Sequence, residues 1–209
     1  MDFIKFIQDG GFFMYPILLV GVLGIAIVIE RLVFLNRVKK QNQALWSIVQ
    51  PDVSKGQLGA ALRQVKDHDS EVGRILDYGL TAATAGADME HVESALEEGL
   101  LESMPRLEAR TTYVATFANI ATLLGLLGTV QGLIVAFESV ANADPAAKGD
   151  LLSSAISVAM NTTAFGLAVA IPLLLAYTFL QNYTQQVVES IEMISMKVQN
   201  QIRQLRRAP

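Results

Sequence analysis

Three glycines and one threonine interrupt an almost entirely apolar stretch of this sequence, "LLGLLGTVQGLI" at residues 123–134. Gly125, Gly128 and Gly132 recur at i, i+3 and i+7, so they share one face of a helix. Small residues in a lipid-embedded helix mark places where two backbones come close, which predicts a packing face. A polar line runs along the flank of that face: Thr129, Thr122 and Asn119.

A second polar face begins the uncharged stretch 151–188. Its first members fall within about a 100° arc of a helix; they are Ser153, Ser154, Ser157 and Asn161. The residues that follow it along the chain are Thr162, Thr163, Gly166 and the helix-kinking Pro172. Ser and Thr hydroxyls often bond their own helix and glycines often only tighten packing, which would explain each residue alone. Two such faces on adjacent helices favour a wet or partner-filled channel, because polar groups at bilayer depth must be satisfied.

No ionisable side chain lies in the interior of these stretches, although a proton relay needs one. The chain has no cysteine, which excludes disulfides, thiolate metal sites and a cysteine nucleophile. It contains no phosphate loop, nucleophile elbow or H-E-x-x-H motif. We therefore expect no enzyme activity, no metal and no cofactor. If ions pass here, the titrating group must come from another chain.

The polar middle of the chain holds other titratable groups, namely Glu93, Glu97, Glu98, Glu102, His68 and His91. The four glutamates form an acidic run, which is typical of a solvated helix face rather than of a metal site. The two histidines are interpreted as solvated surface residues, with a pH switch as the alternative. Twelve acidic against nine basic residues between positions 36 and 110 argue against a nucleic-acid surface.

The charges of the chain are segregated. Twenty consecutive uncharged residues separate Asp9 from Glu30, 27 separate Arg110 from Glu138, and 38 separate Asp150 from Glu189. A membrane-spanning helix needs about 20 mostly apolar residues. The sequence therefore predicts an all-α membrane protein with three transmembrane helices and long cytoplasmic helical extensions. The first stretch lacks a positive flank and a cleavage site, so we expect a span rather than a signal peptide.

Fourteen of the 16 basic residues fit one topology under the positive-inside rule. It predicts an external N-terminal segment at 1–11, a first span at 12–35, a cytoplasmic helical region at 36–110, a second span at 111–137, a short external loop at 138–150, a third span at 151–188 and a cytoplasmic C-terminal helix at 189–209.

Helical patterns fill the predicted cytoplasmic region. The first apolar pattern runs on through Trp46 until Gln50-Pro51, where we expect the helix to stop. Two short helices follow, "QLGAALRQVKD" and "EVGRILDYGLTAAT". Next comes an amphipathic helix whose only obvious break before the second span is Pro105, so one long helix is expected. Its apolar stripe consists of Met89, Val92, Leu96, Leu100 and Leu107. Three short helices make a small core, so we expect these stripes to pack on each other and on neighbouring subunits.

Three segments carry a resemblance to a known family: "GGFFMYPILLVGVLGIAIVIERLVFL", "LLGLLGTVQGLIVAF" and "AISVAMNTTAFGLAVAIPLLL". They resemble, in order, the three spans of the MotA/TolQ/ExbB proton-channel family. The blocks "LGLLGTVQG" and "TTAFGLAVAIP" are the most specific. Three spans rather than four place the chain beside ExbB and TolQ.

The resemblance implies a homopentamer in the bacterial inner (plasma) membrane, with a periplasmic N-terminus and a cytoplasmic C-terminus. The pentamer would surround a dimer of single-span ExbD- or TolR-like subunits, whose transmembrane aspartate carries the proton. Proton-motive force would then drive work on a periplasmic partner such as a TonB-like protein. Thr129 and Thr163 match the family threonines that face this aspartate, whereas Val158 stands where many relatives have glutamate. A gliding-type motor subunit is the alternative within the family.

Two other function classes remain open. The first is a membrane scaffold that conducts nothing and uses the glycine face only for assembly. The second is a substrate transporter, which usually shows repeated halves and broken helices. The chain has no internal repeat, which disfavours the transporter.

Overall fold

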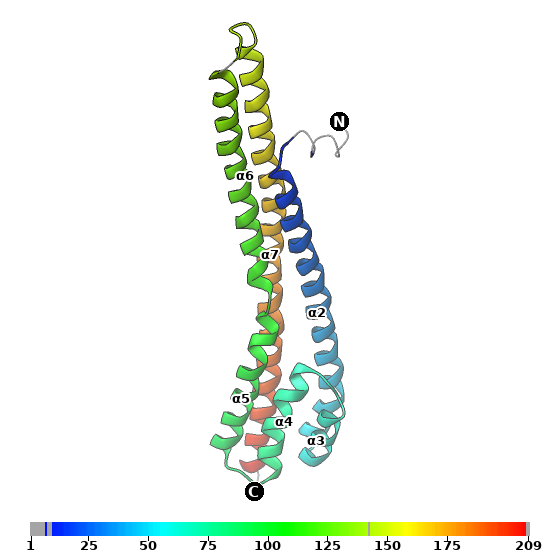
Figure 1. The fold of residues 1–209 in the computed structure, drawn as a ribbon. Helices are drawn as coiled ribbons and strands as arrows, with labels where there is room; N and C mark the ends of the chain where they lie inside the picture. The colour runs from blue at the N-terminus through cyan, green and yellow to red at the C-terminus, as the bar shows by residue number, and fades with distance from the viewer. Residues whose placement is uncertain (1–6, 8–9, 142, 208–209) are drawn as a thin grey trace. The chain divides into compact units, whose positions relative to one another are not determined.

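The computed structural model describes residues 7, 10–141 and 143–207, and this part of the chain contains helices and no strand. The helices are α2 (Met14–Ser54), α3 (Leu58–Lys66), α4 (Glu71–Thr84), α5 (Met89–Glu108), α6 (Thr111–Ala141) and α7 (Lys148–Arg207) (Figure 1). The predicted all-α class is confirmed for the residues described, and so are the two short helices, which are α3 and α4. Most of the predicted segment 1–11, together with residues 142, 208 and 209, lies outside them.

Three helical stretches are long and apolar enough to cross a membrane: Met14–Ser54, Met89–Ala141 and Lys148–Arg207. They contain the second and third uncharged stretches and most of the first, which confirms three candidate spans. The borders of the spans and loops stay predictions.

Helix α2 does not stop at Gln50-Pro51, as the sequence predicted; Pro51 lies inside it. The residue that ends the helix is Gly56, whose φ is 76°. The Gly56 N–H donates to the Val53 carbonyl oxygen at 3.1 Å, and the Gln57 N–H donates to that of Asp52 at 2.9 Å. This pair of bonds is the Schellman motif, which needs a left-handed residue. A proline in the last turn removes only one N–H donor, so it weakens the turn without ending it.

The expected single helix from Met89 into the second span is also wrong. Pro105 lies inside α5, and the break falls at Ala109 and Arg110. Arg110 has a φ of 62°, the left-handed region that residues with a Cβ avoid. Its guanidinium lies 3.5 Å from the Glu30 carboxylate. A backbone conformation that is not visible in the hydrophobic pattern therefore separates α5 from α6.

The chain forms two compact units. One contains residues 31–109 and the chain from 181 onward, and it encloses a hydrophobic core. The apolar stripe of α5 enters this core, because Val92, Leu96 and Leu107 are buried and Met89 and Leu100 pack against them. Leu45 of α2 and Ile191 of α7 belong to the same core. The apolar stripes therefore pack against α2 and α7 of the same chain. The expectation of packing on neighbouring subunits did not include this contribution.

Caps and one buried cation fix this unit locally. The Ser70 hydroxyl accepts from the Gly73 N–H at 3.0 Å, and the Asp88 carboxylate accepts from the His91 N–H at 2.8 Å, which starts α4 and α5. Arg31 is only 2% exposed. Its guanidinium donates to the Leu107 carbonyl oxygen near the end of α5 and lies 4.7 Å from the centre of the Phe34 ring.

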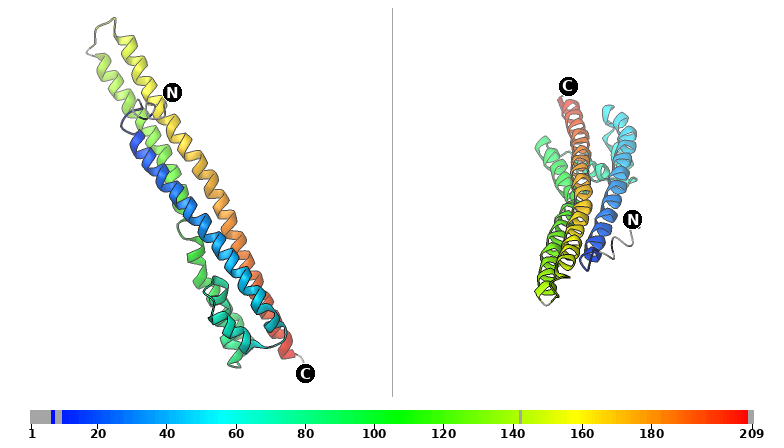
Figure 2. Two further views of the ribbon diagram at one scale, coloured as in Figure 1. Left: turned by 90° about the vertical axis from the view of Figure 1, so that its right-hand side faces the viewer. Right: turned by 90° about the horizontal axis from the view of Figure 1, so that it is seen from above.

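The other unit contains α6, the part of α2 up to Glu30 and the part of α7 up to Leu180. Within it α6 and α7 run antiparallel and side by side, as Figure 1 and the two views of Figure 2 show. Helix α7 continues through Pro172 without a break. Many large apolar side chains of this unit are exposed, among them Leu126, Leu133 and Met160. Exposed apolar side chains on this scale are expected for a surface that contacts lipid or another chain.

Candidate functional site

Helices α6 and α7 pack closely at Gly125, Gly132 and Gly166. A methyl group on Gly125 would lie 3.3 Å from the Thr163 Cα, and one on Gly132 would lie 2.8 Å from the Ala159 Cβ. On the facing helix, a methyl group on Gly166 would lie 2.7 Å from the Ala121 carbonyl oxygen. The glycine face therefore lies against α7, and no larger residue fits there without separating the helices.

Thr163 joins the two helices by a hydrogen bond. Its hydroxyl donates to the Gly125 carbonyl oxygen at 2.9 Å. The α-helical N–H groups already occupy the carbonyls of α6, so this bond uses the second acceptor position of that oxygen. The Thr163 side chain is half-buried. The hydroxyl oxygen keeps its own lone pairs and can still accept a hydrogen bond.

Thr129 is also half-buried, and its hydroxyl donates to the Leu126 carbonyl oxygen of its own helix at 2.6 Å. Thr122 does the same with Ala118 at 3.1 Å, and Asn119 is exposed. These bonds satisfy the donors locally, as is common for threonine in apolar helices. The acceptor capacity of each hydroxyl remains available.

Helix geometry places Thr129 and Thr163 on one edge of the α6–α7 pair. Successive residues are about 100° apart around a helix. On α6, Gly128 packs against Thr162 and Phe13. Thr129 lies about 100° around the helix from Gly128, on the far side of Gly125. On α7, the Thr162 hydroxyl donates to the Gly10 carbonyl oxygen. Thr163 lies about 100° around the helix from Thr162, on the side that faces α6. Both threonines therefore lie on the edge away from Gly10 and Phe13.

The remaining polar residues do not all share that edge. Asn119 and Thr122 lie on the same side of α6 as Thr129, within about 80° of it. On α7, Ser157 and Asn161 lie at least about 120° from Thr163, so they occupy a different flank. Helical spacing gives the angle between residues of one helix, but it does not reveal which neighbour lies on each flank. Helical spacing therefore separates Ser157 and Asn161 from Thr163 on α7, and whether they face a channel stays a prediction.

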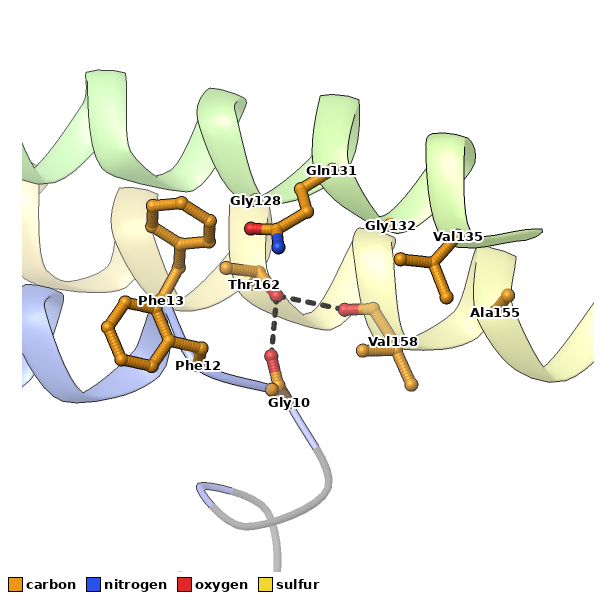
Figure 3. Close-up of a pocket in the computed structure, with 11 residues that line it drawn as sticks. Gly10, Phe12, Phe13, Gly128, Gln131, Gly132, Val135, Ala155, Val158 and Thr162 are labelled. Atoms are coloured by element: carbon orange, nitrogen blue, oxygen red, sulfur yellow. Dashed lines mark hydrogen bonds between the residues drawn. The ribbon is translucent and has the colours of Figure 1, made fainter. Parts of the chain in front are cut away.

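Thr162 is buried and is therefore not part of an exposed edge of the α6–α7 pair. Its hydroxyl lies 2.7 Å from the Gly10 carbonyl oxygen and 3.0 Å from that of Val158, as Figure 3 shows. Around it lies a cavity of about 230 Å³. Its lining residues are Gly10, Gly11, Phe12, Phe13, Gly128, Gln131, Gly132, Val135, Ala155, Val158 and Thr162. No sequence pattern indicated this cavity, since its walls come from three separate segments of the chain.

Two glutamates of the acidic run of α5, Glu93 and Glu102, have structural partners. Glu93 pairs with Arg203 of α7, and the hydrogen bond from Arg203 lowers the pKa of the Glu93 carboxyl. The Tyr78 hydroxyl donates to the Glu102 carboxylate at 2.7 Å, and this bond raises the pKa of Tyr78. Within the described residues, no cluster of three or more His, Asp or Glu side chains is arranged to hold a metal ion. These carboxylates are therefore explained as parts of the helical packing.

Comparison with known proteins gives the family context of these features. Residues 67–193 match the model of a family described as the MotA/TolQ/ExbB proton channel family. The chain is 28% identical over 193 residues to a putative biopolymer transport protein ExbB homolog of Methanothermobacter thermautotrophicus, a match that covers 91% of this chain and 67% of the relative. It is 31% identical over 179 residues to an ExbB-like putative biopolymer transport protein of Synechocystis sp., covering 85% and 84% of the two chains. A shorter match, 34% over 83 residues, is to the Tol-Pal system protein TolQ of Haemophilus influenzae and covers 40% of this chain and 36% of TolQ.

Proposed function

This chain belongs to the MotA/TolQ/ExbB proton channel family, and we propose from that premise that it surrounds a dimer of single-span ExbD- or TolR-like subunits. The chain is a multi-pass membrane protein and a stator-type subunit of a family that is not an enzyme class. The proposed assembly is a homopentamer in the inner membrane, with the N-terminus periplasmic and the C-terminus cytoplasmic. The work that it performs is proposed to be proton-driven and directed to a periplasmic partner such as a TonB-like protein.

One observation carries this proposal. Thr129 and Thr163 share an edge of the α6–α7 pair, yet residues 12–29, 111–137 and 151–188 contain no Asp, Glu, Lys, Arg or His. A hydroxyl cannot carry a proton across a membrane by ionising at physiological pH, whereas a carboxyl can. A titrating carboxyl on a second chain, seated against this edge, would complete the pathway. The single-span partner is proposed to supply it as a transmembrane aspartate.

The hydrogen bonds of the two threonines indicate how their hydroxyls would bind that carboxyl. Each hydroxyl proton is already donated to a backbone oxygen, that of Gly125 or of Leu126. Each hydroxyl oxygen can accept a bond from a protonated carboxylic acid without any rearrangement. To bind the ionised carboxylate, the hydroxyl must turn away from its carbonyl and donate instead. Burial raises the pKa of a carboxyl, so we propose that the edge receives the neutral acid and that rotation of the hydroxyls stabilises the charged form.

Substitution of the two threonines tests the proposal. Thr129→Val and Thr163→Val keep the shape of the side chain and remove its hydroxyl. We expect each variant to assemble normally and to reduce proton-driven work in cells about tenfold or more, because one hydrogen bond to a charged group is worth about 1.5–3 kcal/mol. Thr163→Ser, which keeps the hydroxyl, is expected to retain most of the activity.

Two threonines on the same helices provide matched controls. Thr116 of α6 and Thr178 of α7 are exposed and donate to carbonyl oxygens of their own helices at 3.2 and 3.1 Å. Thr116→Val and Thr178→Val are expected to leave the work unchanged. Full activity in both Thr129→Val and Thr163→Val would contradict the proposed role of this edge.

The composition of the native complex separates the proposal from a non-conducting scaffold. We expect the chain, purified from native membrane with mild detergent, to retain five copies and two copies of a single-span protein that carries a membrane aspartate, as counted by intact mass. A pentamer without such a partner, whose cellular function is insensitive to an uncoupler, would favour the scaffold.

A further inference from the structure

The cavity around Thr162 lies on the opposite side of the α6–α7 pair from the Thr129–Thr163 edge, and the proposed function does not use it. It occupies about 230 Å³. An engineered cavity of about 150 Å³ with apolar walls binds benzene, so this one is large enough for a longer hydrocarbon. We propose that it holds the part of an acyl chain next to the ester group of a membrane phospholipid.

The depth of the cavity supports this occupant. The 21 residues from Arg110 to Gln131 rise about 32 Å along a helix, close to the roughly 30 Å thickness of the hydrocarbon core. If Arg110 and its ion-pair partner Glu30 mark one border of the membrane, Gln131 lies at the other. The cavity is therefore at the border where acyl chains meet the ester groups of one leaflet.

The walls of the cavity match a hydrocarbon. Phe13, Val135, Ala155 and Val158 provide apolar surface (Figure 3). Gly128 and Gly132 add no side chain, so the floor approaches the backbone of α6. The Thr162 hydroxyl is the polar group at the centre, and its proton is directed to the Gly10 or Val158 carbonyl oxygen rather than into free space. An acyl chain makes no demand for hydrogen bonds, so it leaves this arrangement intact.

The rim explains why a lipid can enter. The Phe12 side chain is 73% exposed and that of Val135 is 49% exposed, so both apolar groups at the mouth face outward at the membrane border. The Gln131 amide also lines the cavity, and it can donate to an ester carbonyl of a lipid backbone. A phospholipid therefore offers hydrocarbon to the floor and hydrogen-bond acceptors to the rim.

Photolabelling of the intact complex tests this proposal. The complex, with whatever partner it retains, is reconstituted in vesicles of phosphatidylglycerol that contain a small fraction carrying a diazirine on the acyl chain. After irradiation, labelled peptides are identified by mass spectrometry. We expect strong labelling in residues 128–135 and 155–162. The readout is independent of proton flow, so failure of the threonine experiments would leave it valid.

Two cavity-filling variants and one matched control give the result its meaning. Val135→Trp and Ala155→Leu add volume inside the cavity and are expected to reduce labelling of these peptides at least threefold. Ile134→Trp adds the same side chain at a neighbouring position of similar exposure, 53%, that does not line the cavity. It is expected to leave the labelling unchanged. Equal labelling in all three variants would overturn the proposal.

A second copy of the chain is the competing occupant. The chain has no cysteine, so Val158→Cys introduces a single thiol into the cavity wall. Short bifunctional reagents are expected to produce no cross-linked dimer through this thiol in native membranes. An efficient dimer through Val158→Cys would show that another copy covers the cavity, and the lipid proposal would be wrong.

Discussion

The Thr163 hydroxyl of α7 donates a 2.9 Å hydrogen bond to the Gly125 carbonyl oxygen of α6. The same glycine permits the contact, because its missing side chain lets the Thr163 Cα come within 3.3 Å of where a Cβ would stand. Gly125 and Thr163 therefore provide both the close packing of the two helices and the hydrogen bond between them. A change in the distance between the helices is therefore also expected to change the direction of the Thr163 hydroxyl.

The glycine face gives the first prediction. In Gly166→Ala the new methyl group would lie 2.7 Å from the Ala121 carbonyl oxygen and 3.0 Å from the Gly125 Cα, both backbone atoms that cannot turn aside. We expect a loss of about 1–3 kcal/mol in the free energy of unfolding, measured as a lower unfolding temperature in detergent. Gly59→Ala is the control, because no atom lies within 4 Å of its added methyl group. Equal unfolding temperatures for the two variants would refute close packing at Gly166.

The sequence predicted the elements of this fold well, because charge gaps and helical periodicity report directly on burial. It failed at the helix ends. Pro51 and Pro105 looked like breaks, yet both lie inside helices. The breaks lie at Gly56 and Arg110, where φ is positive. A hydrophobic pattern carries no information on φ, so the arginine in particular could not be recognised.

The candidate site was predictable only in part. The residue types and their angular spacing on each helix follow from the sequence. The neighbour on each flank of α7 does not, because only the structure shows that Thr162 faces Gly10 and that Thr163 faces α6. Thr162 illustrates this, since its acceptor at Gly10 is 152 positions away in the chain.

A second prediction concerns the core of the unit around α4 and α5. Leu45 is fully buried in it. We expect Leu45→Ala to lower the free energy of unfolding of this unit by about 2–5 kcal/mol, since it removes buried methyl groups and leaves a cavity. Hydrogen exchange of α4 and α5 amides measures the loss. Gln43→Ala changes an exposed side chain on the same helix and is expected to stay within about 0.5 kcal/mol of the parent. Similar exchange in both variants would argue against this core.

The Glu93–Arg203 pair gives a prediction of pH dependence. The hydrogen bond from Arg203, followed by one from Gln199, lowers the pKa of the Glu93 carboxyl from its ordinary 4.5. The folded state therefore binds this proton less readily than the unfolded state, and the stabilisation is complete only above the unfolded pKa. We expect it to disappear as the pH falls from about 5 through the lower folded pKa.

Glu93→Gln should consequently unfold at a slightly lower temperature than the parent at pH 7, and the difference should vanish under acid conditions. Protease protection of the end of α7, followed against pH, is the measurement. Glu97→Gln is the control, because Glu97 is exposed and forms no ion pair among the described residues. A difference that persists unchanged below pH 4 would show that the charge of Glu93 is not the cause.

The last prediction isolates the backbone strain at Arg110. A side chain at φ 62° costs about 1–2 kcal/mol relative to glycine. Arg110→Ala and Arg110→Gly both remove the ion pair with Glu30, so that contribution cancels when the two variants are compared. They differ in the Cβ, which only alanine keeps. We expect Arg110→Gly to be the more stable variant by about 1 kcal/mol, visible as a higher unfolding temperature. An alanine variant as stable as the glycine variant, or more stable, would contradict a left-handed backbone at residue 110.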